Sequence, residues 1–144
     1  MISKFAKIIR DTISKFIWLR DEQPEIWNRT HKLLDVKDYL LMRCTGRAVT
    51  TYDLASGGWL FNTRKGELSW SPEILRMLGL DTERLPEVVA STDIVGELSA
   101  GAASDLGLRA GTPVVAGAGD VPSCAVGSGA VQDGAVHIYL GTSS

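Results

Sequence analysis

Apolar residues recur at helical spacing through the first third of the chain. Between residues 5 and 17 they form one side of an amphipathic helix, and a transit peptide is the less favoured reading of this basic segment. Pro24 can open a second helix, with Trp27 on its apolar side. A third helix covers "VKDYLLMRC" and ends near Gly46. The pattern therefore predicts a run of short helices before the first strand.

The types of residue change after this helical region. Residues 48–70 mix β-branched and aromatic side chains with a glycine pair, which predicts short strands or extended loop. A well-marked helix follows, with Ser71 as its cap and Gly79 as its end. Another short helix is expected from Ser99 to Leu106. The middle of the chain thus alternates extended and helical segments.

The C-terminal part predicts a strand, a helix and a second strand. "TPVVAGAG" is typical of a parallel strand buried on both faces, and "VPSCAVGSGA" of a helix with small side chains. "GAVHIYLGTSS" alternates apolar and polar positions and predicts a strand that runs into a Gly-Thr-Ser turn. A strand at this place needs a pairing partner. We therefore expect the sequence to be a fragment or one piece of a larger protein.

Composition and charge narrow the class of protein. The 144 residues are 44% hydrophobic and 22% charged, which suits one globular domain with a core. A net charge of −2 gives no reason to expect nucleic acid or an anionic membrane as partner. Apolar runs are shorter than the ~20 residues that span a bilayer. Cys44 and Cys124 are far apart and suggest neither a disulfide nor a zinc site, so a reducing cytoplasm is the expected location.

Asp120 is the first candidate for chemistry. It lies in "GAGDVPSCAVGSG", where a glycine-rich turn meets the predicted helix. The local pattern favours a helix cap, because a side-chain oxygen can accept the free N–H groups of a helix. The alternative is a carboxylate that accepts a proton from a substrate hydroxyl, which a ligand could approach over the bare backbone of Gly117 and Gly119. Pattern alone leaves both open.

The turn that ends the chain is the second candidate. Gly141, Thr142 and Ser143 follow the last predicted strand. Their backbone N–H groups and hydroxyls could cradle a phosphate, although such a turn in a hairpin is more often only a turn.

Aromatic residues and histidines give weaker signals. The tryptophans are expected in the core or as loop anchors, and Trp59 could instead line a sugar-binding cleft. His31 is expected on a helix surface and His137 on a strand face. Neither has a sequence partner that predicts a catalytic triad or a metal site.

The order of these pieces resembles the FGGY carbohydrate kinases, in particular their xylulokinase-like group. The resemblance runs from about Ile17 to Ser144. It rests on "IWLRDEQPEIWNRTHKLLDVKDYLLMRCTGR", "TYDLAS", "LGLDTERLPEVV", "IVGELSAGAASDLGLRAGTPVVAGAGD" and "AVGSGAVQDGAVHIYLGTSS". Each stretch is a weak signal alone, and their order and spacing together are specific.

The resemblance implies a fold and a domain organisation. The expected class is α/β, as part of an actin-like ATPase (ribonuclease H-like) domain. Residues 1–133 would be the latter part of the N-terminal, sugar-binding domain. Residues 134–144 would be the first strand and phosphate-loop turn of a truncated C-terminal domain. In the family, two such domains face each other across a cleft that holds sugar and ATP.

The resemblance also implies a chemistry, which is ATP-dependent phosphorylation of a sugar or polyol hydroxyl. Asp120 matches the family's catalytic base, which also touches the substrate. Gly141, Thr142 and Ser143 match the loop that contacts nucleotide phosphates. ATP and Mg²⁺ would be the cofactors, with the metal ligand outside this chain. The resemblance leaves a homodimer open.

Departures from the family pattern limit what this chain can do. The family's N-terminal D-x-G-T-type phosphate loop and most of the second domain are missing, so we expect the 144-residue chain alone to be inactive. Val121 and Pro122 follow Asp120, where many xylulokinases have an amide residue, so the sugar is left open. The alternative function is a non-catalytic binding module, or a truncated gene product, on a sugar-kinase scaffold.

Overall fold

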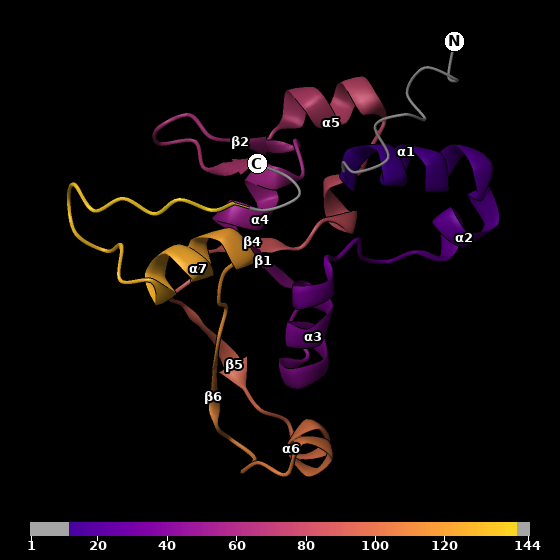
Figure 1. Ribbon diagram of the computed structural model, residues 1–144. Coiled ribbons are helices and arrows are strands. Elements are labelled where there is room, and N and C mark those ends of the chain that lie inside the picture. Colours follow the sequence, from indigo (N-terminus) through magenta and orange to yellow (C-terminus); the bar gives the residue numbers. More distant parts are fainter. Residues whose placement is uncertain (1–11, 141–144) are drawn as a thin grey trace.

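The computed structural model describes residues 12–140 and combines short helices with short strands (Figure 1). The N-terminal helices are α1 (Thr12–Glu22), α2 (Pro24–Arg29) and α3 (Val36–Thr45). All of them were predicted from the sequence, and residues 5–11 of the first predicted helix lie outside the described part. No helix among the described residues is long and apolar enough to cross a membrane.

Local capping signals determine where several helices begin and end. The Asp35 carboxylate accepts the N–H of Val36 at the start of α3, and Gly46 ends this helix with a left-handed φ of 79°. Helices α5 (Pro72–Leu78) and α6 (Ala100–Leu106) begin at serine caps and end at left-handed glycines. These residues are Ser71, Gly79, Ser99 and Gly107. The predicted boundaries of these helices are confirmed.

The strands form three pairs among the described residues. β1 (Val49–Thr51) runs parallel to β4 (Glu87–Val89). β2 (Phe61–Asn62) and β3 (Ser69–Trp70) form an antiparallel pair, as do β5 (Ile94–Glu97) and β6 (Pro113–Val115). Figure 1 shows β1 and β4 near the centre of the molecule, with β5 and β6 extending away from them toward α6.

A helix that the sequence did not predict follows the central strand. α4 (Tyr52–Gly57) occupies part of the segment expected as strands or loop. It begins directly after β1, whose last residue Thr51 has the extended backbone of a helix N-cap. The chain leaves α4 through Gly58 into Trp59, which has a left-handed φ of 62°. The short strand–helix unit therefore replaces the extended run that the β-branched residues suggested.

The strand before Asp120 also differs from the prediction. β6 was expected to be parallel and buried on both faces, yet it pairs antiparallel with β5. Pro113 is exposed and half of the Val115 surface is accessible, at 50%. The error arose because an apolar run does not reveal the direction or the number of its neighbours.

The last predicted strand is absent from the described residues. Residues 135–140 have no regular secondary structure and trace an open loop (Figure 1). Ile138 and Leu140 are 74% and 88% exposed. A strand is defined by its ladder of hydrogen bonds, and no described strand pairs with this segment. His137, expected on a strand face, therefore lies in irregular chain.

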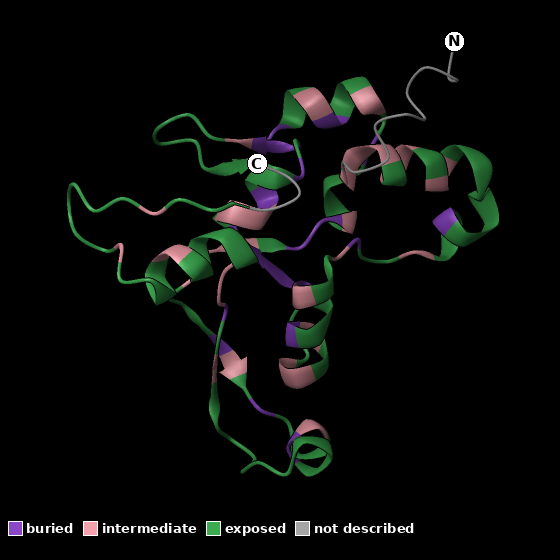
Figure 2. Ribbon diagram, viewed as in Figure 1, coloured by how far each residue is buried: buried purple, intermediate pink, exposed green. Residues whose placement is uncertain are grey.

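Buried side chains form two separate clusters. Figure 2 marks the buried residues along the ribbon. The larger one joins α2, α5 and the connections around them, and α1 packs against it through half-buried apolar residues. The smaller one lies beneath α3 and the central strands. The members of the first are Trp27, Leu33, Leu60, Leu75, Leu80 and Leu85, and those of the second are Leu41, Val49, Val95 and Ala116.

The tryptophans divide between core and surface. Trp27 is buried and Trp70 is half-buried against the larger cluster, as expected for core residues. Trp18 and Trp59 are 56% and 66% exposed, so the expectation of core packing is wrong for these two.

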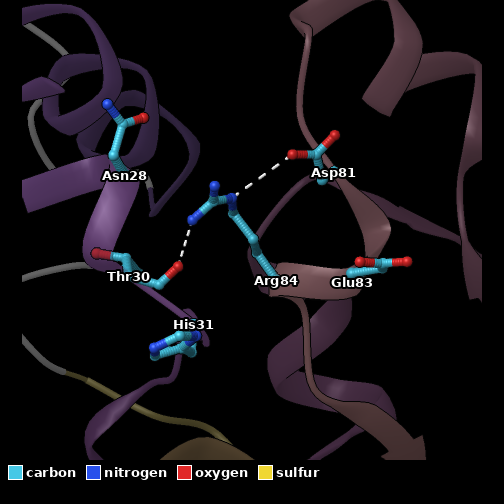
Figure 3. A pocket seen from close by; sticks show the side chains of 6 residues that line it. All are labelled: Asn28, Thr30, His31, Asp81, Glu83 and Arg84. Atoms are coloured by element: carbon cyan, nitrogen blue, oxygen red, sulfur yellow. Dashed lines mark hydrogen bonds and ion pairs between the residues drawn. The ribbon is translucent and has the colours of Figure 1, made fainter.

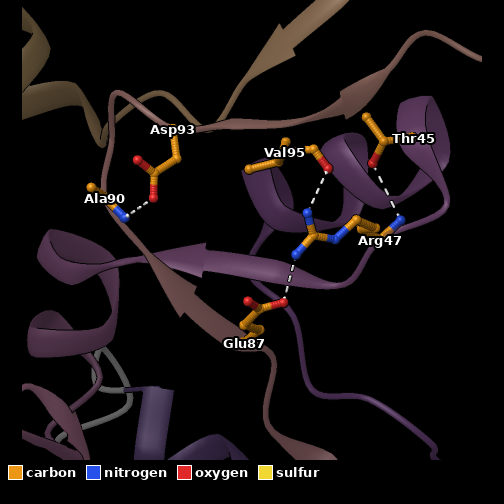
Figure 4. A network of polar contacts seen from close by, with 6 residues as sticks. All are labelled: Thr45, Arg47, Glu87, Ala90, Asp93 and Val95. Atoms are coloured by element: carbon orange, nitrogen blue, oxygen red, sulfur yellow. Dashed lines mark hydrogen bonds and ion pairs between the residues drawn. The ribbon is translucent and has the colours of Figure 1, made fainter.

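Arg47 ties the central strand pair to the β5–β6 arm (Figure 4). Its guanidinium donates to the backbone carbonyl of Val95 at 3.1 Å and forms an ion pair of 2.7 Å with Glu87. Because Glu87 lies on β4 and Val95 on β5, one side chain connects both strand pairs.

We expect Leu60→Ala to lower the free energy of unfolding by about 2–5 kcal/mol, since Leu60 is 1% exposed in the larger cluster and its truncation leaves a cavity. Leu68→Ala is the control, because Leu68 is 50% exposed and should change stability by no more than about 0.5 kcal/mol. Chemical denaturation of the three proteins measures both effects. Equal losses in the two variants would contradict this assignment of the core.

Candidate active site

The segment that leads to Asp120 is held through its backbone. The N–H of Ala116 donates to the carbonyl of Asp93, and the N–H of Gly117 donates to the carbonyl of Ser91, both at 2.9 Å. Gly117 has a φ of 71°, a left-handed conformation that favours glycine. The turn at residues 90–93 is itself closed by the Asp93 carboxylate, which accepts the N–H of Ala90 at 3.0 Å (Figure 4).

Lys37 holds the same segment from helix α3. Its Nζ donates to the carbonyl of Ala116 at 3.1 Å and pairs with the carboxylate of Asp38 at 3.1 Å. The Asp38 side chain is only 3% exposed, so the ammonium compensates a charge that is almost fully removed from water. The ammonium of Lys37 on α3 thus fixes the backbone carbonyl of Ala116, in the segment that leads to Asp120.

Asp53 holds the end of the segment from helix α4. Its Oδ2 accepts the N–H of Gly119 at 2.6 Å, a short distance typical of a bond to an ionised carboxylate. The approach is close: a Cβ added to Gly119 would lie 3.2 Å from this oxygen and 3.3 Å from Cδ2 of Leu54. Glycine is therefore the residue that lets the two segments meet.

Asp120 is the first residue of α7 (Asp120–Gly127). The N-cap position belongs to Gly119, which has no side chain to cap with, so the interpretation of Asp120 as the cap is wrong in position. Its Oδ1 accepts the N–H of Val121 at 2.9 Å, and the residue is exposed. The carboxylate can therefore satisfy one N–H of the first turn and still meet a ligand from solution.

The rest of the first turn has an unusual composition. Val121 is 51% exposed beside the carboxylate, and Pro122 has no N–H. The first intrahelical bond runs from the N–H of Ser123 to the carbonyl of Gly119 at 3.2 Å. An apolar side chain and a proline therefore adjoin the candidate base.

The environment of Asp53 shifts the pKa of its carboxyl. Burial raises the pKa, but the Thr51 side chain and the backbone N–H groups of Gly119, Asp53 and Leu54 outweigh it, and the pKa lies below the ordinary value. Asp53 is thus ionised near neutral pH.

The other predicted site residues lie outside this arrangement. Gly141, Thr142 and Ser143 fall beyond the described residues. Within residues 12–140, no three His, Cys, Asp or Glu side chains gather in a way that could hold a metal ion.

Lys37 and Asp53 were missed by the sequence reasoning. Lys37 sits in the helix "VKDYLLMRC", where a lysine normally points to solvent, and Asp53 sits in a segment predicted as strand or loop. A carboxylate two positions after a buried strand was the only local signal for Asp53.

A separate hollow of about 360 Å³ lies between the end of α2 and the turn before β4 (Figure 3). Its cation, Arg84, donates to the carbonyls of Trp27 and Thr30 and pairs with Asp81 at 3.6 Å. The same guanidinium lies 4.8 Å from the centre of the Trp27 ring. Arg84 therefore fastens α2 to this turn and offers little to a ligand.

The histidines and cysteines supply no further chemistry. His31 is exposed in the loop after α2, which differs from the helix surface expected for it. Nδ1 of His137 lies 3.0 Å from the Ser128 hydroxyl. Cys44 and Cys124 are both free thiols, as expected.

Comparison with known proteins extends this description. Residues 6–127 match the family model described as "FGGY family of carbohydrate kinases, N-terminal domain". Xylulose kinase of Lactococcus lactis is 35% identical over 132 residues, which are 92% of this chain and 26% of that protein. Gluconokinase of Bacillus subtilis is 32% identical over 131 residues, 91% of this chain and 25% of that protein. The chain thus spans about a quarter of the curated relatives that it matches.

Solved structures agree with these matches. The ligand-bound xylulose kinase from Lactobacillus acidophilus superposes with a TM-score of 0.75 at 28% identity, over 83% of this chain and 24% of that one. Xylulose kinase from Rhodospirillum rubrum superposes with a TM-score of 0.78 at 22% identity, over 86% of this chain and 25% of that one. The expected α/β fold, part of an actin-like ATPase domain, is confirmed.

The lowered pKa of Asp53 predicts how acid affects stability. A carboxyl whose pKa is depressed on folding contributes stability above its unfolded pKa of about 4, and the contribution is lost as the pH falls through the folded pKa. We therefore expect Asp53→Asn to lower the melting temperature most at pH 6–7, with the difference from wild type shrinking below about pH 4. Thermal unfolding across this range measures it, and a difference that grows with acidity would contradict the assignment.

Proposed function

Because the chain belongs to the FGGY family of carbohydrate kinases, we propose that the gene product containing it phosphorylates a hydroxyl of a sugar or polyol at the expense of ATP. Asp120 is the general base of this reaction. The observation that carries the proposal is an exposed carboxylate at the start of α7, on a backbone segment held from several sides. The proposal concerns the intact gene product, including whatever sequence flanks this chain.

The proton balance of the reaction assigns one task to Asp120. The O–H bond of the sugar breaks while its oxygen forms a bond to the γ-phosphorus, and the bond between that phosphorus and the bridging oxygen of ADP breaks. The proton passes to the Asp120 carboxylate, of which one oxygen already accepts the N–H of Val121. In phosphoryl transfer the protein mainly positions groups and stabilises charge, so a fixed base suits the reaction.

The remaining parts of the nucleotide and metal site are assigned outside the described residues. ATP supplies the phosphoryl group when bound, and Gly141, Thr142 and Ser143 would contact its phosphates. Mg²⁺ would be held by residues outside this chain. The match of residues 6–127 to an N-terminal domain supports a boundary near residues 133 and 134.

The substrate is proposed to be xylulose or a related sugar or polyol. Relatives named as xylulose kinases support this class, and relatives named as gluconokinases support a sugar acid as well. Val121 and Pro122 place no amide beside Asp120, which distinguishes this site from many xylulokinases. A panel of pentoses, hexoses, polyols and sugar acids, assayed on the intact gene product, identifies the substrate.

Asp120→Asn should abolish turnover in the intact gene product, because an amide cannot take the proton, while ATP binding is largely retained. Removal of a general base typically costs about 10²–10⁴-fold in rate. A coupled ADP-release assay measures turnover, and calorimetry measures ATP binding.

Asp105→Asn is the matched control, since Asp105 is exposed on α6 at the far end of the β5–β6 arm (Figure 1). It should leave kcat unchanged. Turnover near the wild-type rate in Asp120→Asn would show that the base is elsewhere. Absence of kinase activity in the wild-type gene product on every substrate would favour a non-catalytic binding module.

The 144-residue chain alone is expected to show no ATP-dependent phosphorylation, because it covers about a quarter of its relatives (26% of the first). Incubation with radiolabelled ATP and the sugar panel tests this expectation, with the intact gene product as the positive control. Measurable sugar phosphate from the isolated chain would refute it.

A further inference from the structure

We propose that Asp53 is a positioning residue for catalysis: by binding the N–H of Gly119 it sets the place of the Asp120 carboxylate. The inference rests on the proposed role of Asp120 as the base. It is carried by the 2.6 Å bond between Oδ2 of Asp53 and the N–H of Gly119, across 66 positions of the chain.

The segment before Asp120 is positioned by packing only at Ala116. Gly117 and Gly119 have no side chains, and only Ala116 among residues 116–119 is buried. Its place is therefore determined by hydrogen bonds to its backbone. The bonds from Ser91, Asp93 and Lys37 hold residues 116 and 117, two or more positions before Gly119. Asp53 is the described side chain that binds the residue directly before Asp120.

The geometry transmits a displacement of Gly119 to the base. Gly119 is the N-cap of α7, and its Cα lies about 3.8 Å from that of Asp120 across one planar peptide. A change in the Gly119 peptide therefore moves the first turn of α7 and the carboxylate on it. Misplacement of a catalytic group by about 1 Å can reduce the rate by about 10²-fold.

Asp53 is carried by an element that starts at the buried centre of the fold. It lies in the first turn of α4, where the partial positive charge of the helix end stabilises an anion. α4 follows directly from β1, whose residues are all buried, so the carboxylate is attached to the centre of the fold. The side chain thus links a buried strand to the exposed base.

The test compares substitutions at the two ends of this bond in the intact gene product. Asp53→Ala removes the acceptor and should lower kcat about 10–100-fold with less than about a threefold change in either KM. Asp53→Asn retains an oxygen that can accept the same N–H, and should keep kcat within about fivefold of wild type. Gly119→Ala forces the Cβ against Oδ2 and Leu54 at a φ of −65°, which alanine tolerates, and should lower kcat as Asp53→Ala does.

Two controls separate positioning from general destabilisation. Ser99→Ala removes an acceptor of a helix-start N–H at α6, away from Asp120, and Gly101→Ala adds a Cβ that meets nothing within 4 Å. Both should leave kcat unchanged. If Ser99→Ala, at an equal loss of melting temperature, lowers kcat as much as Asp53→Ala, the effect is general and the proposal is overturned.

Amide hydrogen exchange gives a readout that does not depend on kinase activity. Exchange at the Gly119 N–H should be about tenfold faster in Asp53→Ala and close to wild type in Asp53→Asn. Unchanged exchange in Asp53→Ala would overturn the proposal. If Asp120→Asn abolishes turnover while Asp53→Ala keeps the wild-type kcat, only the positioning role of Asp53 is refuted. If Asp120→Asn remains active, the proposed role of Asp120 as the base is refuted, whatever the exchange result.

Discussion

A backbone without side chains has to be fixed by its own N–H and C=O groups, and this constraint governs the region around Asp120. Gly119 permits close approach and Gly117 adopts a left-handed backbone, but neither contributes a side chain to packing. Neighbouring side chains must therefore supply hydrogen-bond donors to the carbonyls of this segment and acceptors to its N–H groups. Lys37 offers an ammonium to a carbonyl, and Asp53 offers a carboxylate to an N–H. Elements from three parts of the chain converge on one short segment for this reason.

The two hydrophobic clusters give those elements fixed positions. Leu41, Val49 and Ala116 belong to one cluster. This cluster therefore joins three parts of the molecule: helix α3, which carries Lys37, strand β1, which precedes Asp53, and the start of the segment 116–119. Arg47 then connects this core to the β5–β6 arm through Glu87 and Val95. The polar contacts at the site thus depend on apolar packing a few residues away.

Local signals predicted local structure well. Helix ends at Ser71, Gly79 and Gly107 were correct because a cap is decided by one residue and its immediate neighbours. The direction of β6 was wrong because it depends on β5, which the apolar run does not encode. The contact of Asp53 with Gly119 joins residues 66 positions apart and has no local signature. The start of a helix at Asp120 was predicted from the sequence, while the contacts of Lys37 and Asp53 with the segment before it were not.

The make-up of the first turn of α7 restricts what that helix end can bind. A helix start normally attracts anions through several unpaired N–H groups. Here Pro122 contributes none and the N–H of Val121 is already bonded to Asp120, so at most one donor precedes the first intrahelical bond at Ser123. A carboxylate at the same end adds repulsion. This helix end is thus poorly suited to binding a phosphate group through its backbone.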